Sequence, residues 1–321
     1  MSNKLRIVFM GTPEFAVESL RALVENNYNV VAVVTMPDKP VGRHHDTLQA
    51  SPVKQYAVEQ GIPVLQPERL KDEAFLDQLR SYKADIQVVV AFRMLPEVVW
   101  AMPPRGTFNL HAALLPQYRG AAPINWAIIN GETRTGVTTF FLDHDIDTGR
   151  IIHRESCEIS DVDTVETVYE RLMRMGAKLV MRTLDDVESD CVQPIPQDEL
   201  VEGELHSAPK IFKDTCRIDW SSHTVKSAYD FIRGLSPYPG AWTVLRDAKG
   251  KEQVLKVFNS LIPDSQRLRV TPTSKVNTPL AIPVTLSDGI LYLTDIQLAG
   301  KKRMSAADFL RGFNMENVEL V

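Results

Sequence analysis

The sequence of 321 residues is poor in cysteine and has no long apolar run. Its three cysteines, Cys157, Cys191 and Cys216, are far apart and odd in number, which argues against a disulfide framework or a zinc site. No segment reaches the roughly 18 consecutive apolar residues of a membrane span. The N-terminus passes almost directly into a strand pattern and lacks a signal-peptide cleavage region. Together these absences predict a protein of the reducing cytoplasm that does not enter a membrane.

Motifs of several enzyme classes are also missing. The first strand-to-helix turn reads MGTPEFA and lacks the GxGxxG pattern that seats a dinucleotide pyrophosphate. No serine or cysteine lies in an elbow motif, so a covalent acyl-enzyme is not expected. His44 and His45 are adjacent, but nothing nearby completes a ligand set. The sequence therefore predicts no metal site and no bound dinucleotide.

Charge is unevenly distributed along the chain, which has 36 basic and 41 acidic residues in all. Residues 207–321 contain 16 Lys and Arg but 11 Asp and Glu, a net charge of about +5. The remainder therefore has 20 basic and 30 acidic residues, about −10. A basic module joined to an acidic one favours a polyanionic partner for the smaller half. Chance variation across solvated surfaces is the alternative explanation.

Apolar strands and amphipathic helices alternate in the first part of the chain. Residues 5–10, 30–35 and 86–91 form apolar runs rich in branched side chains, as in buried parallel strands. Thr12 and Pro13 suit the start of the first helix, and Asp163 with Glu166 resembles a capping box before a long helix. A polar loop is expected at 36–49. This pattern predicts an α/β domain at 1–188 with a Rossmann-like, mostly parallel sheet.

A second, smaller domain is predicted to follow. Residues 189–206 are polar and contain Pro194 and Pro196, as expected of an interdomain linker. Short strand-like runs at 254–258, 281–286 and 290–296 are separated by turn residues, and a helix is expected at 305–313. Residues 207–321 are therefore predicted to form a small OB-like β-barrel.

The most informative segment reads TFNLHAALLPQYRGAAP, at 107–123. Its first part is a short strand, in which residues two apart face the same way, so the Asn109 amide and the His111 imidazole share one face. A second segment, GVTTFFLDHDIDTGRII at 136–152, places Asp147 in a turn between two strand-like runs. An amide donor, an imidazole and a carboxylate are the parts of an acyl-transfer site.

Each of these residues has an ordinary structural explanation as well. An asparagine near a strand end is often a turn residue, and a lone histidine is often a satisfied structural group. Asp147 could form an Asx-turn, and Asp143 and Asp145 compete with it for a chemical role. Chemistry alone leaves these alternatives open.

A resemblance to a known family favours the chemical interpretation. The strings NLHAALLP at 109–116, RGAAP at 119–123 and GVTTFFLDHDIDTG at 136–149 resemble the formyltransferases that use 10-formyltetrahydrofolate. The wider pattern is similar to the members of that family that act on methionyl-tRNA. It includes FMGTPEFA at 9–16, PDKPVGR at 37–43, SPVK at 51–54, RIDW at 217–220 and AGKKRMSAADFL at 299–310.

The resemblance implies roles for particular residues. The catalytic trio would be Asn109, His111 and Asp147, with Asp147 orienting His111. Folate would be held by Ala113, Leu114, Leu115 and Pro116, and a loop of Phe92, Arg93, Met94 and Leu95 would form the wall of the pterin pocket. Phosphates of tRNA would be held by Arg43, Lys210, Lys213, Lys301, Lys302 and Arg303. Ala113 stands where the family commonly has serine, and Arg93 replaces a small residue.

The implied reaction moves a formyl group from 10-formyltetrahydrofolate to the α-amino group of methionine on initiator tRNA, leaving tetrahydrofolate. A monomer without a metal cofactor is expected. Three other functions remain open at this point. The same trio could hydrolyse formyl-folate, a related enzyme could formylate an amino sugar nucleotide, and a non-catalytic protein could bind RNA alone.

Overall fold

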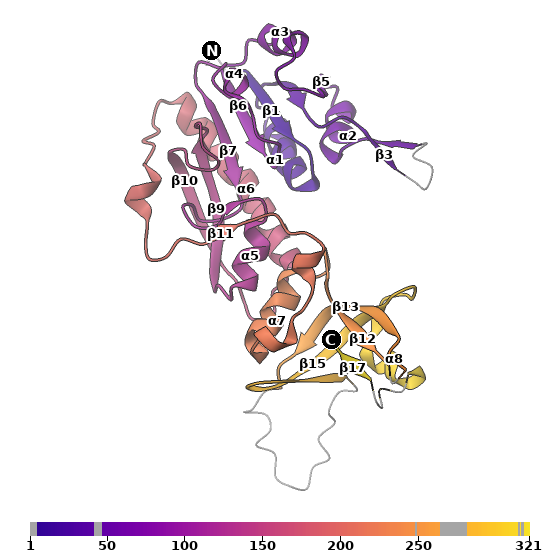
Figure 1. The fold of residues 1–321 in the computed structure, drawn as a ribbon. Helices are drawn as coiled ribbons and strands as arrows, with labels where there is room; N and C mark the ends of the chain where they lie inside the picture. The colour runs from indigo at the N-terminus through magenta and orange to yellow at the C-terminus, as the bar shows by residue number, and fades with distance from the viewer. Residues whose placement is uncertain (1–4, 42–46, 248, 264–280, 314, 316–317) are drawn as a thin grey trace. The chain divides into compact units, whose positions relative to one another are not determined.

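The computed structural model describes residues 5–41, 47–247, 249–263, 281–313, 315 and 318–321. The chain divides into two compact units. The first unit comprises Met1–Pro123, Thr135–Cys157 and Tyr169–Ser207, and the second comprises Ile124–Arg134, Glu158–Val168 and Ala208–Val321. Figure 1 labels the elements of both units. The domain limits expected from the sequence, with a linker at 189–206, stay a prediction.

A seven-stranded sheet forms the centre of the first unit, in the order β10-β9-β7-β6-β1-β2-β5 (Figure 1). Its strands are β1 (Ile7–Gly11), β2 (Val30–Val34), β5 (Val64–Leu65), β6 (Ile86–Val90), β7 (Thr107–His111), β9 (Arg134–Phe141) and β10 (Ile151–Glu158). The pairs β1–β2, β1–β6, β2–β5 and β6–β7 are parallel, whereas β7 and β9 are antiparallel. The predicted mostly parallel sheet is confirmed.

Helices bury both faces of this sheet, so its central strands are apolar throughout. The helices of this part of the chain are α1 (Glu14–Glu25), α2 (Pro52–Glu59), α3 (Glu73–Ser81), α4 (Glu97–Trp100) and α6 (Val165–Glu188). One core cluster joins Leu76 and Leu79 of α3 to Val89 of β6. Leu110 of β7 packs so closely on α6 that a side chain at Gly176 would meet it at 2.6 Å. The neighbouring positions, Asn109 and His111, therefore face away from α6.

Two local predictions near the N-terminus are wrong. Pro13, not Thr12, is the N-cap of α1, and no side chain caps the helix there. Residues 36–49 are not wholly irregular, because Lys39–Val41 (β3) and Thr47–Gln49 (β4) pair as a short antiparallel hairpin. Proline at position 40 is compatible with a two-stranded ribbon, where one edge of each strand needs no ladder hydrogen bond.

The capping box at the start of α6 lies one residue later in the chain than the sequence predicts. Thr164 and Thr167 form the reciprocal contacts expected of a capping box, with Thr164 N donating to Thr167 Oγ1 at 3.0 Å. Asp163 instead accepts hydrogen bonds from Ser160 N and the Thr167 hydroxyl, each at 2.8 Å. The predicted pairing of Asp163 with Glu166 is therefore replaced by a neighbouring one.

The second unit contains an antiparallel, barrel-like sheet in the order β14-β15-β13-β12-β17, with β16 paired to β15. Its strands are β12 (Ala241–Arg246), β13 (Glu252–Leu261), β14 (Ile282–Leu286), β15 (Gly289–Leu298), β16 (Met304–Ser305) and β17 (Glu319–Leu320). Figure 1 labels β12, β13, β15 and β17 of this sheet. Buried and exposed positions alternate along β12 and β14, as in a sheet with one buried face. The predicted small β-barrel is confirmed.

Helices complete the core of this unit. They are α7 (Val225–Gly234) and α8 (Ala306–Gly312), together with most of α5 (Pro123–Ile129). The sequence reasoning missed α7, although Thr224 and Ser227 form a capping box at its start. The remaining short elements of the chain are β8 (Arg119–Gly120), β11 (Ser207–Ala208), η1 (Gln197–Leu200), η2 (Asp214–Cys216) and η3 (Trp220–Ser222). In the described part of the chain, no helix combines the length and the apolar composition that a membrane span requires.

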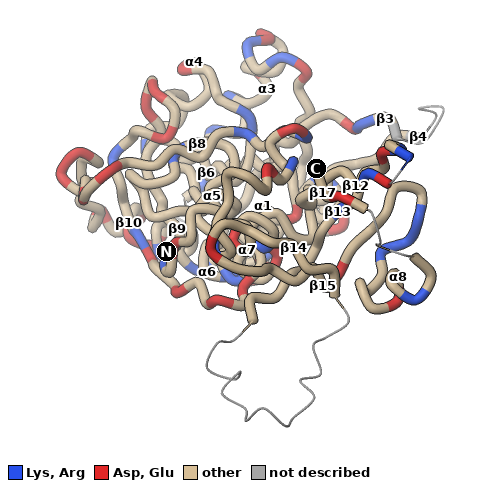
Figure 2. The backbone as a smooth tube through the Cα atoms, turned by 60° about the horizontal axis from the view of Figure 1, so that its bottom comes forward, with Lys and Arg blue, Asp and Glu red and all other residues tan. Residues whose placement is uncertain are grey.

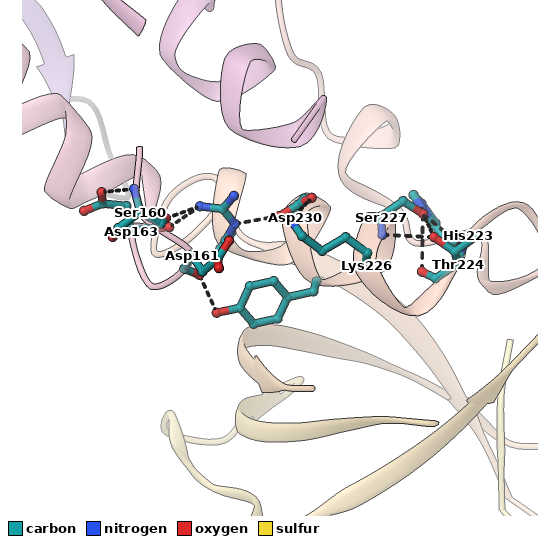
Figure 3. Close-up of polar contacts among 10 residues, drawn as sticks. Ser160, Asp161, Asp163, His223, Thr224, Lys226, Ser227 and Asp230 are labelled. Carbon is teal, nitrogen blue, oxygen red and sulfur yellow. Dashed lines mark hydrogen bonds and ion pairs between the residues drawn. The ribbon is translucent and has the colours of Figure 1, made fainter. Parts of the chain in front are cut away.

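A buried arginine joins α7 to the segment before α6 within the second unit (Figure 3). Arg233 Nε donates to Asp230 Oδ1 at 2.8 Å, and Arg233 Nη1 donates to the carbonyl oxygens of Ser160 and Asp163 at 3.0 and 2.9 Å. Lys226 Nζ donates to both oxygens of Asp230. Tyr229 adds a hydrogen bond from its hydroxyl to Asp161 O at 2.8 Å. One guanidinium thus bonds a buried carboxylate and two backbone carbonyls.

Loss of this guanidinium is expected to destabilise the second unit. The side chains of Arg233 and Asp230 are 7% and 4% exposed, so Arg233→Ala removes one of the donors of a buried carboxylate and the guanidinium donor of two carbonyls. We expect urea denaturation to show that the free energy of unfolding falls by about 3 kcal/mol. This is the low end of the range for a broken buried ion pair, because Lys226 remains beside Asp230.

Arg311 provides a matched control, since it forms the same i,i+3 pair with Asp308 but with side chains 74% and 55% exposed. Arg311→Ala should change the unfolding free energy by no more than about 0.5 kcal/mol. Equal losses in the two variants would show that burial does not determine the strength of the Arg233 contact.

Candidate active site

The candidate site lies at the carboxyl edge of β6 and β7. Parallel pairing sets Val90, the last residue of β6, opposite Leu110 of β7. The loop after β6 and the end of β7 therefore emerge side by side, which is where ligands collect in open parallel sheets. Asn109 is half-buried on β7, and its carboxamide has no hydrogen-bond partner among the residues that the structure describes. Its amide donor is thus available at this edge.

His111 is held by a backbone carbonyl. Its side chain is 6% exposed, and Nε2 lies 2.8 Å from the carbonyl oxygen of Tyr118. A carbonyl can only accept a hydrogen bond, so Nε2 carries a proton and Nδ1 is the nitrogen left to exchange one. Nδ1 lies 3.9 Å from Asp147 Oδ2, which is too far for a direct hydrogen bond but close enough for electrostatic attraction. The sequence reasoning missed the Tyr118 carbonyl, which no side-chain motif reveals.

Asp147 lies in a strained turn between β9 and β10. Its φ angle is 56°, in the left-handed region that side chains other than glycine rarely adopt. Its side chain is 14% exposed, and Oδ2 accepts a hydrogen bond from Gly120 N at 3.0 Å. Gly149 closes the same turn so tightly that a Cβ atom there would lie 1.7 Å from Phe141 O. Strain that the surroundings enforce in this way is common at functional sites.

The competing carboxylates of this turn are placed differently. Asp143 and Asp145 are both exposed, and Asp143 Oδ1 accepts a hydrogen bond from His144 N at 2.7 Å. Among the described residues, Asp147 is the carboxylate that lies within 4 Å of the His111 ring. The structure thus brings Asn109, His111 and Asp147 to one region of the first unit.

The loop after β7 is held by hydrogen bonds to Thr138 of β9. The Thr138 hydroxyl donates to Ala113 O at 2.6 Å and accepts from Leu115 N at 3.1 Å. Arg154 Nη1 donates to Leu115 O at 3.1 Å. The side chains of Ala113 and Leu115 are fully buried, and Leu114 is half-buried. A ligand here would therefore meet mainly backbone, so alanine in place of serine at position 113 removes little contact area.

The loop after β6 is held by Arg93. Its guanidinium donates to Glu68 O at 2.9 Å and to Pro67 O, and it lies over the Phe92 ring at 5.7 Å. Burial lowers the pKa of Arg93. Arg93 Nε is buried and, within the described residues, has no hydrogen-bond acceptor.

The predicted phosphate-binding residues differ in how free their charges are. Lys210, Lys213, Lys301 and Lys302 are all exposed in the second unit. Arg303 instead pairs with Asp295 at 2.5 Å and stacks on Phe258 at 4.3 Å, so its charge is partly neutralised. Figure 2 shows these charges along the backbone, including the basic stretch beside α8. Arg43 lies outside the described residues.

Comparison with known proteins gives the family that the sequence motifs resemble. The Formyl transferase family model matches residues 5–184, and the Formyl transferase C-terminal domain model matches residues 210–314. The methionyl-tRNA formyltransferases of Parabacteroides distasonis and Bacteroides thetaiotaomicron are 60% and 59% identical over 311 and 315 residues. These alignments cover 96% and 98% of this chain and 96% and 97% of the two relatives.

A solved structure supports the fold. HypX from Aquifex aeolicus in complex with tetrahydrofolic acid superposes with a TM-score of 0.59 at 20% identity. The match covers 96% of this chain and 47% of the longer HypX chain. At this level of identity the likeness concerns the fold alone.

The parallel sheet, the barrel-like second unit and the matched segments define a two-part formyl transferase. The chain belongs to the formyl transferase family, and its relatives at 48–60% identity carry the name methionyl-tRNA formyltransferase. The resemblance inferred from the motifs is thereby confirmed.

Removal of the Thr138 hydroxyl is expected to loosen the loop after β7. In Thr138→Val, the buried Leu115 N–H and Ala113 C=O are both left without their partner, and we expect unfolding to be easier by about 1–3 kcal/mol. Thr139→Val is the control. Among the described residues, the Thr139 hydroxyl has its hydrogen bond with the Thr183 hydroxyl, which keeps its own bond to Leu179 O in the variant. Urea denaturation of both variants makes the comparison, and an equal effect would contradict the role assigned to Thr138.

Proposed function

We propose that this chain transfers the formyl group of 10-formyltetrahydrofolate to the α-amino group of methionine on initiator tRNA, using Asn109, His111 and Asp147. The observation that carries the proposal is their placement at one edge of the sheet. Asn109 offers an amide that has no partner among the described residues, His111 has Nδ1 available, and the Asp147 carboxylate lies 3.9 Å from that nitrogen. The names of the close relatives support the choice of reaction.

In the proposed mechanism, the methionine amine adds to the formyl carbon of the folate donor and gives a tetrahedral intermediate, which collapses as the bond from that carbon to the folate nitrogen breaks. Asn109 donates a hydrogen bond to the formyl oxygen as negative charge develops there. His111, protonated on Nδ1, places a positive charge beside the same oxygen. The incoming amine must be neutral, and a free α-amino group has a pKa of about 7.7–8.0, so a useful fraction is available near neutral pH.

Asp147 takes part in moving the proton of the amine. The 3.9 Å gap between Asp147 Oδ2 and His111 Nδ1 is too long for direct transfer, whereas a water molecule can bridge such a separation. Through that water, Asp147 accepts the proton that the attacking amine loses and passes it on to the folate nitrogen as that nitrogen leaves. The carboxylate and the imidazole therefore share one proton pathway.

We place the folate along the loops after β6 and β7, at Phe92–Leu95 and Ala113–Pro116. Two observations support this placement. The Arg93 guanidinium fixes the loop after β6 by donating to Glu68 O and Pro67 O. Met94 is 70% exposed and leaves an apolar side chain for a flat ring to cover.

We place the tRNA backbone on the second unit, through Lys210, Lys213, Lys301 and Lys302. Arg303 contributes less in this proposal, because Asp295 already offsets its charge. Arg43 keeps the same proposed role, although it lies outside the described residues. A substrate of this kind places the enzyme in the cytoplasm, where aminoacyl-tRNA is made and used, and we propose that it acts there as a monomer.

Formyl transfer by purified protein tests the function directly. Supplied with 10-formyltetrahydrofolate and charged initiator Met-tRNA, the protein should yield formylated tRNA and an equal amount of tetrahydrofolate. Asn109→Ala and Asp147→Asn should fold normally and lose kcat by about a hundredfold or more, the usual effect of losing a preorganised group at a developing charge. Asn is chosen at position 147 because it tolerates the left-handed backbone.

Asp143→Asn is the matched control, since it removes an exposed carboxylate from the same turn, and its kcat should stay within about threefold of the wild type. Near-normal turnover in Asn109→Ala or Asp147→Asn would remove that residue from the trio. Formate release without formylated tRNA would indicate a hydrolase. Formylation of an amino sugar nucleotide would indicate a sugar enzyme, and tRNA binding without folate turnover would indicate an RNA-binding protein.

The tRNA surface has its own test. Lys301→Ala with Lys302→Ala should weaken tRNA binding and reduce the slope of log Kd against log salt by about one for each phosphate that the protein no longer neutralises. Lys178→Ala is the control, because Lys178 lines a groove with Ile7 at the amino end of β1, away from the candidate site. An unchanged salt slope in the double variant would contradict the proposed surface.

A further inference from the structure

Gln197 is the most completely bonded side chain near the candidate site that the reaction does not itself use. It begins the short helix η1, inside the polar segment at 189–206, and is 3% exposed. The segment is fastened to the first unit just before it, where Ile195 and Ile151 exchange two backbone hydrogen bonds of 2.9 Å. A glutamine that is buried within a polar, proline-containing segment is unexpected from sequence alone.

The Gln197 amide uses all of its hydrogen-bonding capacity on two segments of the candidate site. Nε2 donates to the carbonyl oxygens of Asp147 and Gly149, both at 2.8 Å. Oε1 accepts from Arg119 Nε at 3.0 Å and from Arg119 Nη2 at 2.6 Å. Two donors and two acceptor positions are therefore filled, with no charge of its own added beside the carboxylate.

These contacts hold the backbone of the Asp147 turn, and a different residue holds its carboxylate. Gly120, the residue after Arg119, donates its N–H to Asp147 Oδ2 at 3.0 Å. Gln197 thus forms hydrogen bonds with the backbone of Asp147 and the side chain of Arg119, while Gly120 forms one with the Asp147 carboxylate. The backbone of Asp147 is left-handed, with φ 56°, and the hydrogen bonds from Gln197 to the carbonyls of Asp147 and Gly149 limit its movement.

We infer that Gln197 is a positioning residue, which sets the direction of the Asp147 carboxylate toward His111 by fixing the backbone carbonyls of the Asp147 turn. This inference rests on the proposed role of Asp147 in formyl transfer. It assigns a part in the reaction to a segment whose composition predicts only a connection between domains. Because Gln197 acts through Asp147, its removal should lower turnover and leave substrate binding almost unchanged.

The test measures kcat and both KM values of formyl transfer for Gln197→Ala, in the wild-type and in the Asp147→Asn background, well below the melting temperature. We expect Gln197→Ala to lower kcat by about tenfold or more, with KM values within about threefold, as for a small misplacement of a reacting group. In the Asp147→Asn background the same substitution should have little further effect, since two residues on one path are not additive. A purely structural role would give equal losses in both backgrounds.

Two further variants sharpen the result. Gln197→Glu keeps an acceptor for Arg119 but places negative charge against the carbonyls of Asp147 and Gly149, so it should lose as much kcat as Gln197→Ala. If it retains wild-type kcat, Gln197 serves Arg119 and the inference is overturned. Gln117→Ala is the control. Gln117, like Arg119, joins the loop after β7 to the segment at 189–206, through Glu204 O and His206 N, but among the hydrogen bonds of the described residues it has none to the Asp147 turn.

Each remaining outcome is decisive as well. Wild-type kcat in Gln197→Ala, or equal loss in both backgrounds, overturns the inference while formyl transfer by the wild type stands. If Gln117→Ala lowers kcat as much as Gln197→Ala does, the inference is also overturned. Loosening the segment at 189–206 would then lower kcat without any change in the contact between Gln197 and the Asp147 turn. If the wild-type protein transfers no formyl group to Met-tRNA, the proposed function itself fails, and that result is distinct from all of these.

Discussion

Parallel pairing of β6 with β7 is the constraint on which the candidate site depends. It sets Val90 opposite Leu110, so the loop that carries Arg93 and the strand that carries Asn109 and His111 reach the same edge of the sheet. The close contact of Leu110 with α6 then decides which face of β7 the two polar side chains occupy. A shift of one residue in this pairing would turn both toward the core.

Beyond β7 the site consists of irregular segments, and buried polar groups determine their positions. The Tyr118 carbonyl fixes the ring of His111, the Thr138 hydroxyl fixes the loop after β7, and the Gln197 amide fixes the Asp147 turn. Each contact satisfies groups that would otherwise be buried without a partner, so each is enforced by the free energy of leaving them unpaired. The chemistry proposed for this site thus relies on residues that do not react.

Charge in the second unit shows why a net count is an incomplete guide to a binding surface. The excess of basic residues at 207–321 includes Arg233, which is buried against Asp230, and Arg303, which is paired with Asp295. Lys301 and Lys302 are exposed. Attraction of a polyanion depends on charges that remain available at the surface, and the sequence does not distinguish these from paired ones.

The sequence by itself determined the sheet class and the family. Apolar runs and turn residues predict β1, β2 and β6 closely because burial on both faces requires continuous apolar strands, and the motif around Asn109 and His111 identifies the family. Only the tertiary structure decided that Asp147, not a neighbouring aspartate, faces His111. It also decided that Gln197 belongs to the site, because its hydrogen bonds join segments up to 78 residues apart, and local patterns carry no information about such contacts.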